Sequence, residues 1–308
     1  METQVVTGAF GFSGKYIARR LLKKNIIVKT LTNSVNRKNE FQNKIIVSPF
    51  HFDDADKMAA ALEGASVLYN TYWVRFNHKN FHHSEAVDNT LKLFEAAKRA
   101  GVQRIVHTSI TNPDKNSKLE YFSGKGILEE ALIHSGISYA ILRPAVLFGK
   151  EDILINNIAW MVRKFPVFGL FGDGNYRLQP IFVEDYADLA ITEGEKKENT
   201  IVDAIGPESF TYRELVNVVS KIILGKKRLI FSMPDEIGYW MSKLVGVIKG
   251  DVLVTREEIK GLKGDLLYTT SPAAGKTKLT DWLIANKGTV GKEYANEIKR
   301  RKDRTISY

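Results

Sequence analysis

Short apolar runs alternate with longer stretches of helical periodicity through the first half of the chain. Apolar runs bounded by turn residues are typical of buried strands, and apolar positions three and four apart are typical of helices. Strands separated by helices predict a parallel sheet covered on both faces. The expected strands are Gln4–Val6, Ile26–Leu31, Ile45–Val47, Val67–Asn70, Arg104–His107 and Tyr139–Leu142, and the expected helices include Asp54–Leu62, Phe81–Ala100 and Tyr121–Ser135.

The pattern changes after Pro144. A helix is expected over Asp152–Lys164 and a strand over Gln179–Val183, followed by a helix that Asp185 would cap. Further helices should begin at the capping boxes Thr211–Glu214 and Thr255–Glu258. We therefore expect a sheet domain over residues 1–150, to which residues 178–204 return, and a smaller lobe over residues 151–308.

Composition narrows the class of protein. A chain of 308 residues is long enough for one large core, or for one core and a smaller lobe. The absence of cysteine excludes disulfides and thiolate metal ligands, and it fits a reducing compartment. No signal-peptide pattern opens the chain, and no apolar run approaches the roughly 20 residues of a membrane span. A cytoplasmic protein is expected.

The net charge of +10 is concentrated in Lys15–Lys44 and Lys292–Arg304. Since no zinc finger, basic zipper or RNP-type motif accompanies it, we expect a polyanionic small molecule as partner and no nucleic acid. The apolar stretch Asp235–Gly250 is expected to be a buried helix, and contact with a membrane surface or a protein partner is the alternative.

The turn Thr7–Gly14, TGAFGFSG, is the most specific signal in the chain. It follows the first expected strand and precedes the amphipathic stretch Tyr16–Leu22. Glycines let the backbone turn sharply and approach a pyrophosphate closely, and a helix N-terminus presents unpaired N–H groups to the phosphates. This order of strand, turn and helix predicts a dinucleotide site of the Rossmann type.

The end of the second strand predicts which dinucleotide binds. An acidic residue there would bond a free ribose 2′-hydroxyl, but no Asp or Glu occurs between Gly14 and Glu40. Asn33 and its hydroxyl-bearing neighbours lie there instead, followed by Arg37 and Lys38. A 2′-phosphate needs such donors and a cation, so NADP is favoured over NAD. The alternative is that these cations are ordinary solvated loop charges.

One acidic residue after the third strand is placed to accept a hydrogen bond from the adenine amine. Asp53 and Asp54 both qualify, and either could instead cap the helix that follows.

Tyr121, Lys125 and Ser109 form the candidate catalytic set. Tyr121 and Lys125 are four residues apart and share a helix face, and Ser109 ends the fifth strand, whose carboxyl end borders the ligand crevice. An ammonium beside the phenol would lower its pKa, and the serine would bond a substrate carbonyl. Gly124 and Gly126 suggest close approach of another backbone or of the cofactor. A surface pair is the alternative.

These segments resemble the short-chain dehydrogenase/reductase superfamily in its extended and atypical branches. The resemblance is to NAD(P)-binding epimerase/dehydratase-like proteins, related to the NmrA-like and complex I 39-kDa-subunit-like groups. It covers residues 3 to about 204. The matching segments are Thr7–Gly14, Ile105–Ser109, Tyr121–Lys125, Ile141–Gly149 and Pro180–Ala190.

The resemblance implies a Rossmann-type sheet with a C-terminal substrate lobe, and it assigns roles to residues. Lys125 would also bind the nicotinamide ribose, Tyr72 or Trp73 would line the nicotinamide channel, and Arg177 and Gln179 would contact substrate. The remaining cofactor-binding positions implied are Gly8, Phe10, Gly11, Phe12, Gly14, Asn33, Arg37, Asp53, Pro144 and Val146.

The chain departs from the family pattern at two points. Asn70–Trp73 replaces a small-residue segment with aromatic rings, and Ala86 stands where extended members often have asparagine. The sequence therefore predicts an NADP(H)-dependent oxidoreductase or epimerase/dehydratase-type enzyme acting on a small carbonyl or hydroxyl substrate. The alternative is a non-catalytic NAD(P)-binding sensor or assembly protein. No metal site is expected, because His78, His82 and His83 lack a further ligand at a typical spacing.

Overall fold

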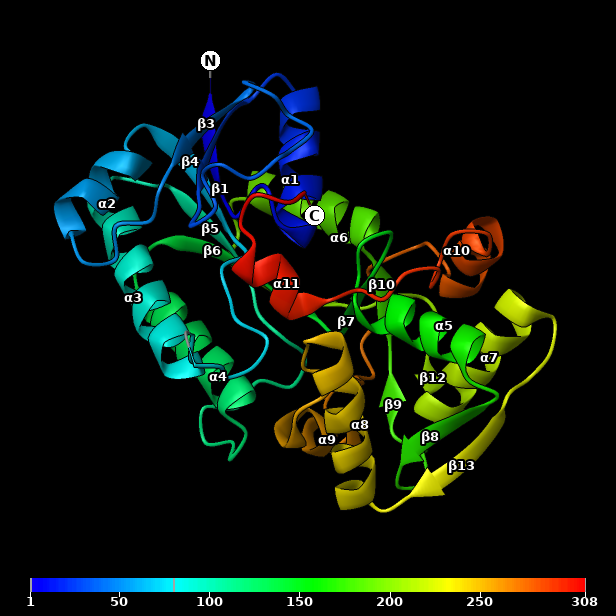
Figure 1. Ribbon diagram of the computed structural model, residues 1–308. Coiled ribbons are helices and arrows are strands. Elements are labelled where there is room, and N and C mark those ends of the chain that lie inside the picture. Colours follow the sequence, from blue (N-terminus) through cyan, green and yellow to red (C-terminus); the bar gives the residue numbers. More distant parts are fainter. Residues whose placement is uncertain (1, 80, 308) are drawn as a thin grey trace. The chain divides into compact units, whose positions relative to one another are not determined.

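The computed structural model describes residues 2–79 and 81–307 (Figure 1). The chain divides into two compact units. The first consists of Met1–Pro144, Tyr186–Asp203 and Arg304–Tyr308, and the second of Ala145–Asp185 and Ala204–Asp303.

The first unit is built on a seven-stranded sheet in the order β11-β6-β5-β4-β1-β2-β3, and the pairs from β3 to β6 are parallel. The chain moves outward from β1 through β2 to β3 and then crosses back to β4, so the topological switch point lies between β1 and β4. This is a Rossmann-type α/β fold, as predicted. Its elements are β1 Thr3–Thr7, α1 Phe12–Lys23, β2 Ile27–Leu31, β3 Ile45–Ser48, α2 Ala55–Leu62, β4 Ala65–Asn70, α3 His83–Arg99, β5 Arg104–Thr108, α4 Glu120–His134, β6 Ser138–Pro144, α6 Val183–Glu195 and β11 Thr200–Ala204.

Helices cover both faces of this sheet. On one face, α2, α3 and α4 bury side chains such as Leu62, Leu93 and Leu128 against Val5 and Ile105 of the strands. On the other face α1 packs against β1 and β2, and its basic end forms ion pairs with α6. Because both faces are covered, most residues of the central strands β1, β4 and β5 are buried, which agrees with the short apolar runs in the sequence.

The second unit has a core of its own, formed mainly by α5, α7, α10 and the short strands around them. The capping boxes expected at Thr211 and Thr255 are both present. Its elements are β7 Val146–Phe148, α5 Leu154–Lys164, β8 Val167–Phe171, β9 Arg177–Leu178, β10 Pro180–Phe182, β12 Phe210–Thr211, α7 Tyr212–Leu224, β13 Leu229–Met233, α8 Asp235–Lys249, α9 Arg256–Lys263, α10 Leu279–Asn286 and α11 Glu297–Lys302.

The expectation that Asp185 caps a helix is wrong. Helix α6 already begins at Val183, and the Asp185 carboxylate accepts hydrogen bonds from the backbone N–H groups of Lys276 and Thr277 and from the Thr277 hydroxyl. Its role is to hold the 276–277 segment.

Candidate functional site

The glycine-rich turn requires glycine at two positions, for different reasons. Gly8 has φ +65°, in the left-handed region, and its carbonyl oxygen accepts the Gly11 N–H at 2.8 Å. A Cβ on Gly14 would lie 2.3 Å from that oxygen. Gly14 therefore lets α1 begin directly against the turn that ends β1.

The N-terminus of α1 is open to an anion. Within α1, all of whose residues are described, the first turn contains no acidic residue, and the N-cap Gly11 makes no side-chain capping bond. The first N–H groups of a helix need an acceptor, and the helix dipole adds positive potential there. A dinucleotide pyrophosphate satisfies both requirements, so the residues present fit this group.

The turn is fixed to β4 through the Thr7 hydroxyl. This oxygen accepts the N–H groups of Thr71 and Tyr72 at 2.7 and 3.1 Å and donates to Asn70 Oδ1 at 3.1 Å. Asn70 Nδ2 lies 3.1 Å from Nδ1 of buried His107. Burial and the charge of Lys125 both lower the His107 pKa, so the imidazole is neutral. The hydrogen bonds from Thr7 through Asn70 to His107 thus link the carboxyl ends of β1, β4 and β5.

The loop after β2 carries hydroxyl groups and a buried cation. The Thr32 hydroxyl accepts the Ser34 N–H at 3.0 Å. Arg37 is only 6% exposed, and its guanidinium contacts the Ser34 hydroxyl at 3.4 Å. Burial contradicts the alternative that Arg37 is a solvated loop charge, whereas Lys38 is exposed.

The end of the chain lies against this loop, which the sequence did not predict. Arg304 donates to the Asn33 carbonyl at 3.0 Å, and the Lys38 N–H donates to the Thr305 carbonyl at 2.9 Å. Both contacts use a backbone carbonyl as the acceptor, which any residue provides. Only the basic character of the tail could have indicated them in the sequence.

The two aspartates after β3 have different roles. Asp54 caps α2 by accepting the Lys57 N–H at 3.0 Å, which leaves Asp53 exposed and not engaged as a cap. Beside them, Phe50 and Phe52 form a stacked pair with ring centroids 4.6 Å apart.

Tyr72 contacts both of these phenylalanine rings, at 5.1 and 5.2 Å between centroids. Asn89 donates to its hydroxyl at 3.1 Å. Asn89 was not among the residues expected in the site, although an asparagine on the buried face of the expected helix was the available signal.

Lys125 is buried at the carboxyl end of β5. Its Nζ donates to the Thr108 carbonyl at 2.7 Å and lies 4.1 Å from the centroid of the Trp73 ring. Burial lowers the Lys125 pKa to about 7, and the nearby Glu129 carboxylate opposes that shift only in part because it pairs with Arg143.

Trp73 contacts both of the residues expected to act together. Its face meets the Lys125 ammonium, and its ring packs edge-on to Tyr121 with centroids 5.6 Å apart. The His83 imidazole stacks on Trp73 and also meets Tyr121 edge-on. The structure therefore gathers Tyr121 and Lys125 around one indole.

The two glycines of α4 accommodate neighbours. A Cβ on Gly124 would lie 3.0 Å from both the Trp73 ring and Val87, and one on Gly126 would lie 2.4 Å from the Lys115 nitrogen. Close approach of another backbone is therefore confirmed at Gly126, whereas the neighbours of Gly124 are side chains.

The remaining candidates occupy separate places. The Ser109 side chain is buried, and its hydroxyl has no hydrogen-bond partner among residues 2–79 and 81–307. Pro144 ends β6 in the first unit, and Val146 begins β7 in the second.

In the second unit, Arg177 pairs with Asp265, and Gln179 Oε1 accepts the Thr269 N–H at 2.8 Å. Both side chains therefore bind the 265–269 segment.

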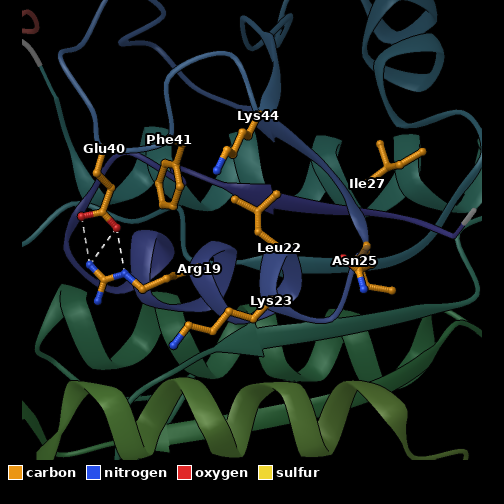
Figure 2. A pocket seen from close by; sticks show the side chains of 9 residues that line it. Arg19, Leu22, Lys23, Asn25, Ile27, Glu40, Phe41 and Lys44 are labelled. Carbon is orange, nitrogen blue, oxygen red and sulfur yellow. Dashed lines mark hydrogen bonds and ion pairs between the residues drawn. The ribbon is translucent and has the colours of Figure 1, made fainter.

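A shallow groove on the first unit lies along the outer side of α1 (Figure 2). Its described lining contains none of the predicted site residues, and it includes an ion pair in which Arg19 donates two hydrogen bonds to Glu40. The lining residues are Arg19, Leu22, Lys23, Asn25, Ile26, Ile27, Glu40, Phe41 and Lys44.

Comparison with known proteins agrees with this geometry. Residues 8–157, just under half of the chain, match the model of the NAD(P)H-binding family. A homologous protein is the mitochondrial NADH dehydrogenase [ubiquinone] 1 alpha subcomplex subunit 9 of Arabidopsis thaliana, 28% identical over 71% of this chain. The match spans 57% of that protein's own length.

Two solved structures share the fold. The triphenylmethane reductase of Citrobacter sp. complexed with NADP(H) has a TM-score of 0.73 at 17% identity, covering 93% of this chain and all of that one. The NADPH-dependent quinone oxidoreductase of Escherichia coli complexed with NADPH has a TM-score of 0.72 at 21% identity, covering 92% of this chain and 98% of that one.

Proposed function

We propose that this protein binds NADP(H) and transfers hydride to or from a small carbonyl or hydroxyl substrate, as an oxidoreductase or as an epimerase or dehydratase acting through a keto intermediate. The observation that carries the proposal is Lys125, a lysine excluded from water at the carboxyl end of β5, one helical turn after Tyr121. Burying an ammonium group is unfavourable, so a fold that does so near its ligand crevice supports a chemical role for it.

Each residue of the set has a distinct task. The bound nicotinamide supplies or accepts the hydride. Tyr121 gives its phenolic proton to the substrate oxygen during reduction, and Ser109 donates a hydrogen bond to the same oxygen. A protonated Lys125 stabilises the phenolate left on Tyr121, and its pKa of about 7 lets that charge respond to the bound nucleotide.

The preference for NADP over NAD rests on the loop after β2. Arg37 and the hydroxyls of Thr32 and Ser34 supply a cation and donors, and no carboxylate follows β2 before Glu40. A 2′-phosphate would find charge-assisted hydrogen bonds there, whereas the free 2′-hydroxyl of NAD would find no carboxylate to accept its hydrogen bond.

Calorimetric titration with NADPH and NADH tests this preference. We expect NADPH to bind at least about tenfold more tightly, and Arg37→Met to remove most of that difference because one charge-assisted contact contributes roughly 1.5–3 kcal/mol. Lys44→Met, on the outer groove, is the control and should leave the ratio unchanged. Equal affinities in the wild type would disprove the preference.

The second candidate function is nucleotide binding without turnover. The position of the Trp73 ring favours it. This ring lies against the Lys125 ammonium and contacts Tyr121, so bulky aromatic groups occupy space beside both residues of the catalytic set. The Arabidopsis relative is named as a subunit of a larger complex, which also supports a binding or assembly role.

Turnover separates the two candidates. For an enzyme, we expect NADPH oxidation with some member of a panel of aldehydes, ketones and quinones, and loss of that activity in Tyr121→Phe with NADPH binding retained. If wild type binds NADPH but oxidises it with no panel member, while Trp73→Ala gains activity, the binding role is favoured.

A further inference from the structure

Helix α8 presents an apolar stripe to solvent. Its most exposed apolar side chains recur at helical spacing, and three of them, Leu244, Val247 and Ile248, are 64 to 74% exposed. Such a stripe on the outside of a folded unit indicates an interaction surface. The full stripe is Ile237, Trp240, Met241, Leu244, Val247 and Ile248.

The opposite side of α8 is the side that packs on the second unit. A Cβ on Gly238 would lie 2.7 Å from the Phe171 ring, and one on Gly246 would lie 2.6 Å from the Asp251 carbonyl oxygen. Small residues thus bring this face against the body of the unit. The expectation that α8 is simply a buried helix is wrong, because its large apolar side chains point outward.

The apolar surface continues onto the two-stranded sheet beside α8. Strands β13 and β8 are parallel, with Leu229 opposite Val167, and Leu229 is 70% exposed. Phe231 lies on the same face of the sheet as Leu229, two residues on, and is also exposed. Figure 1 shows β13 leading directly into α8.

The charges around the stripe are mainly positive. Residues 226–263 contain eight basic and five acidic residues. The acidic groups are engaged: Asp235 pairs with Lys263 at 2.7 Å and Glu236 with Arg256 at 2.8 Å.

Asp251, a third acidic group, accepts the Tyr294 hydroxyl and two backbone N–H groups. Lys226, Lys227 and Lys243 form no ion pair within the described part of the chain. Lys243 Nζ lies 4.8 Å from the Trp240 ring centroid, so a lysine and an indole meet at the edge of the stripe.

We propose that α8 and the adjoining end of β13 dock the second unit onto an anionic lipid bilayer. The helix has 15 residues and is therefore about 22 Å long, shorter than the hydrocarbon core of about 30 Å. No helix in residues 2–79 and 81–307 is both long and apolar enough to cross a bilayer. The helix lies in the plane of the interface, with its apolar stripe among the acyl chains and its lysines at the headgroups.

Vesicle flotation tests this docking. The full chain should float with vesicles of phosphatidylcholine mixed with phosphatidylglycerol, much less with phosphatidylcholine alone, and less as salt is raised. Leu244→Asp combined with Ile248→Asp should weaken binding at least about tenfold, because each charge would enter the acyl region. Ile284→Asp on α10, an apolar position in the same unit that is 56% exposed, is the control and should bind like wild type.

Tryptophan fluorescence gives a second readout. Trp240 is 57% exposed, so its fluorescence emission should shift to shorter wavelength when the protein binds anionic vesicles. The Trp240→Phe variant should lose that shift. The proposal is overturned if wild type does not float with anionic vesicles, or if the double aspartate variant floats equally well. A wild-type dimer that the double variant dissociates, without vesicle binding, would identify the stripe as a contact between two copies.

Discussion

Adding a single methyl group at Gly14 should destabilise the fold and weaken nucleotide binding. Its Cβ would meet the Gly8 carbonyl oxygen at 2.3 Å, and backbone cannot move aside as a flexible side chain can. We expect Gly14→Ala to lower the free energy of unfolding by about 1–3 kcal/mol and to weaken NADPH binding more than about tenfold. Gly288→Ala is the matched control, because nothing lies within 4 Å of its Cβ position. Urea denaturation and calorimetry measure both effects, and unchanged affinity in Gly14→Ala would contradict the placement of the pyrophosphate.

Lys125 should make stability depend on pH. Its folded-state pKa of about 7 lies below the ordinary lysine value, so between about pH 7 and 10 the unfolded chain binds more protons than the folded chain. The free energy of unfolding therefore rises with pH across this window, by at most about 1.4 kcal/mol per pH unit from this group.

Denaturation of the Lys125→Met variant tests this dependence. We expect the variant to be more stable than wild type near pH 7 and to lack the lysine's share of the slope. Lys243→Met, at an exposed position, should retain the wild-type slope. Parallel profiles for wild type and Lys125→Met would show that Lys125 is not buried as described.

Single residues also show where sequence reasoning reaches its limit. The sequence indicated that Gly124 and Gly126 allow close approach, because glycine in a helix interior is unfavourable, but it contained no information on the partners Trp73 and Lys115. Asn89 was missed because its partner Tyr72 lies on another element. Asp185 was misassigned for the same reason, since a carboxylate suited to capping can equally bind a distant backbone.

Elements were predicted more accurately than contacts. The strands and helices of the first unit follow from local periodicity, and the positive φ angles at Gly64, Gly101 and Gly136 agree with the expected helix ends. The outward face of α8 was not predictable, because periodicity shows that one face is apolar and not whether that face is covered.

The tail after α11 belongs functionally with the loop after β2. The Arg304 guanidinium donates to the Asn33 carbonyl, so it adds a positive charge to the loop that also carries Arg37. We expect Arg304→Gln to weaken NADPH binding about threefold to tenfold while leaving NADH binding nearly unchanged, because only NADPH carries the 2′-phosphate. Lys302→Gln makes the same change of charge outside this contact and should have a smaller effect. Calorimetric titration of both variants with NADPH and NADH measures these effects. Equal effects of the two substitutions would show that the tail acts only through its general positive charge.

At the scale of the whole chain, nucleotide binding should stabilise the first unit selectively. A ligand at about 100 times its dissociation constant adds roughly 2.7 kcal/mol to the unit that binds it, which corresponds to about 5–10 °C. Trp73 is the tryptophan of the first unit, and Trp160, Trp240 and Trp282 belong to the second. In a variant with phenylalanine at those three positions, Trp73 fluorescence reports the unfolding of the first unit. We expect NADPH to raise the melting temperature measured in this way. Absence of a shift at saturating NADPH would count against a nucleotide site in the first unit.

The return of the last residues to the first unit bears on how the protein is handled in the laboratory. Arg304 and Thr305 contact the loop where we place the adenosine phosphate, so a fluorescent label or tag attached beside these residues would lie close to that loop. We expect such a group to weaken NADPH binding by crowding the loop. Affinity measurements should therefore use protein without a label or tag at these positions.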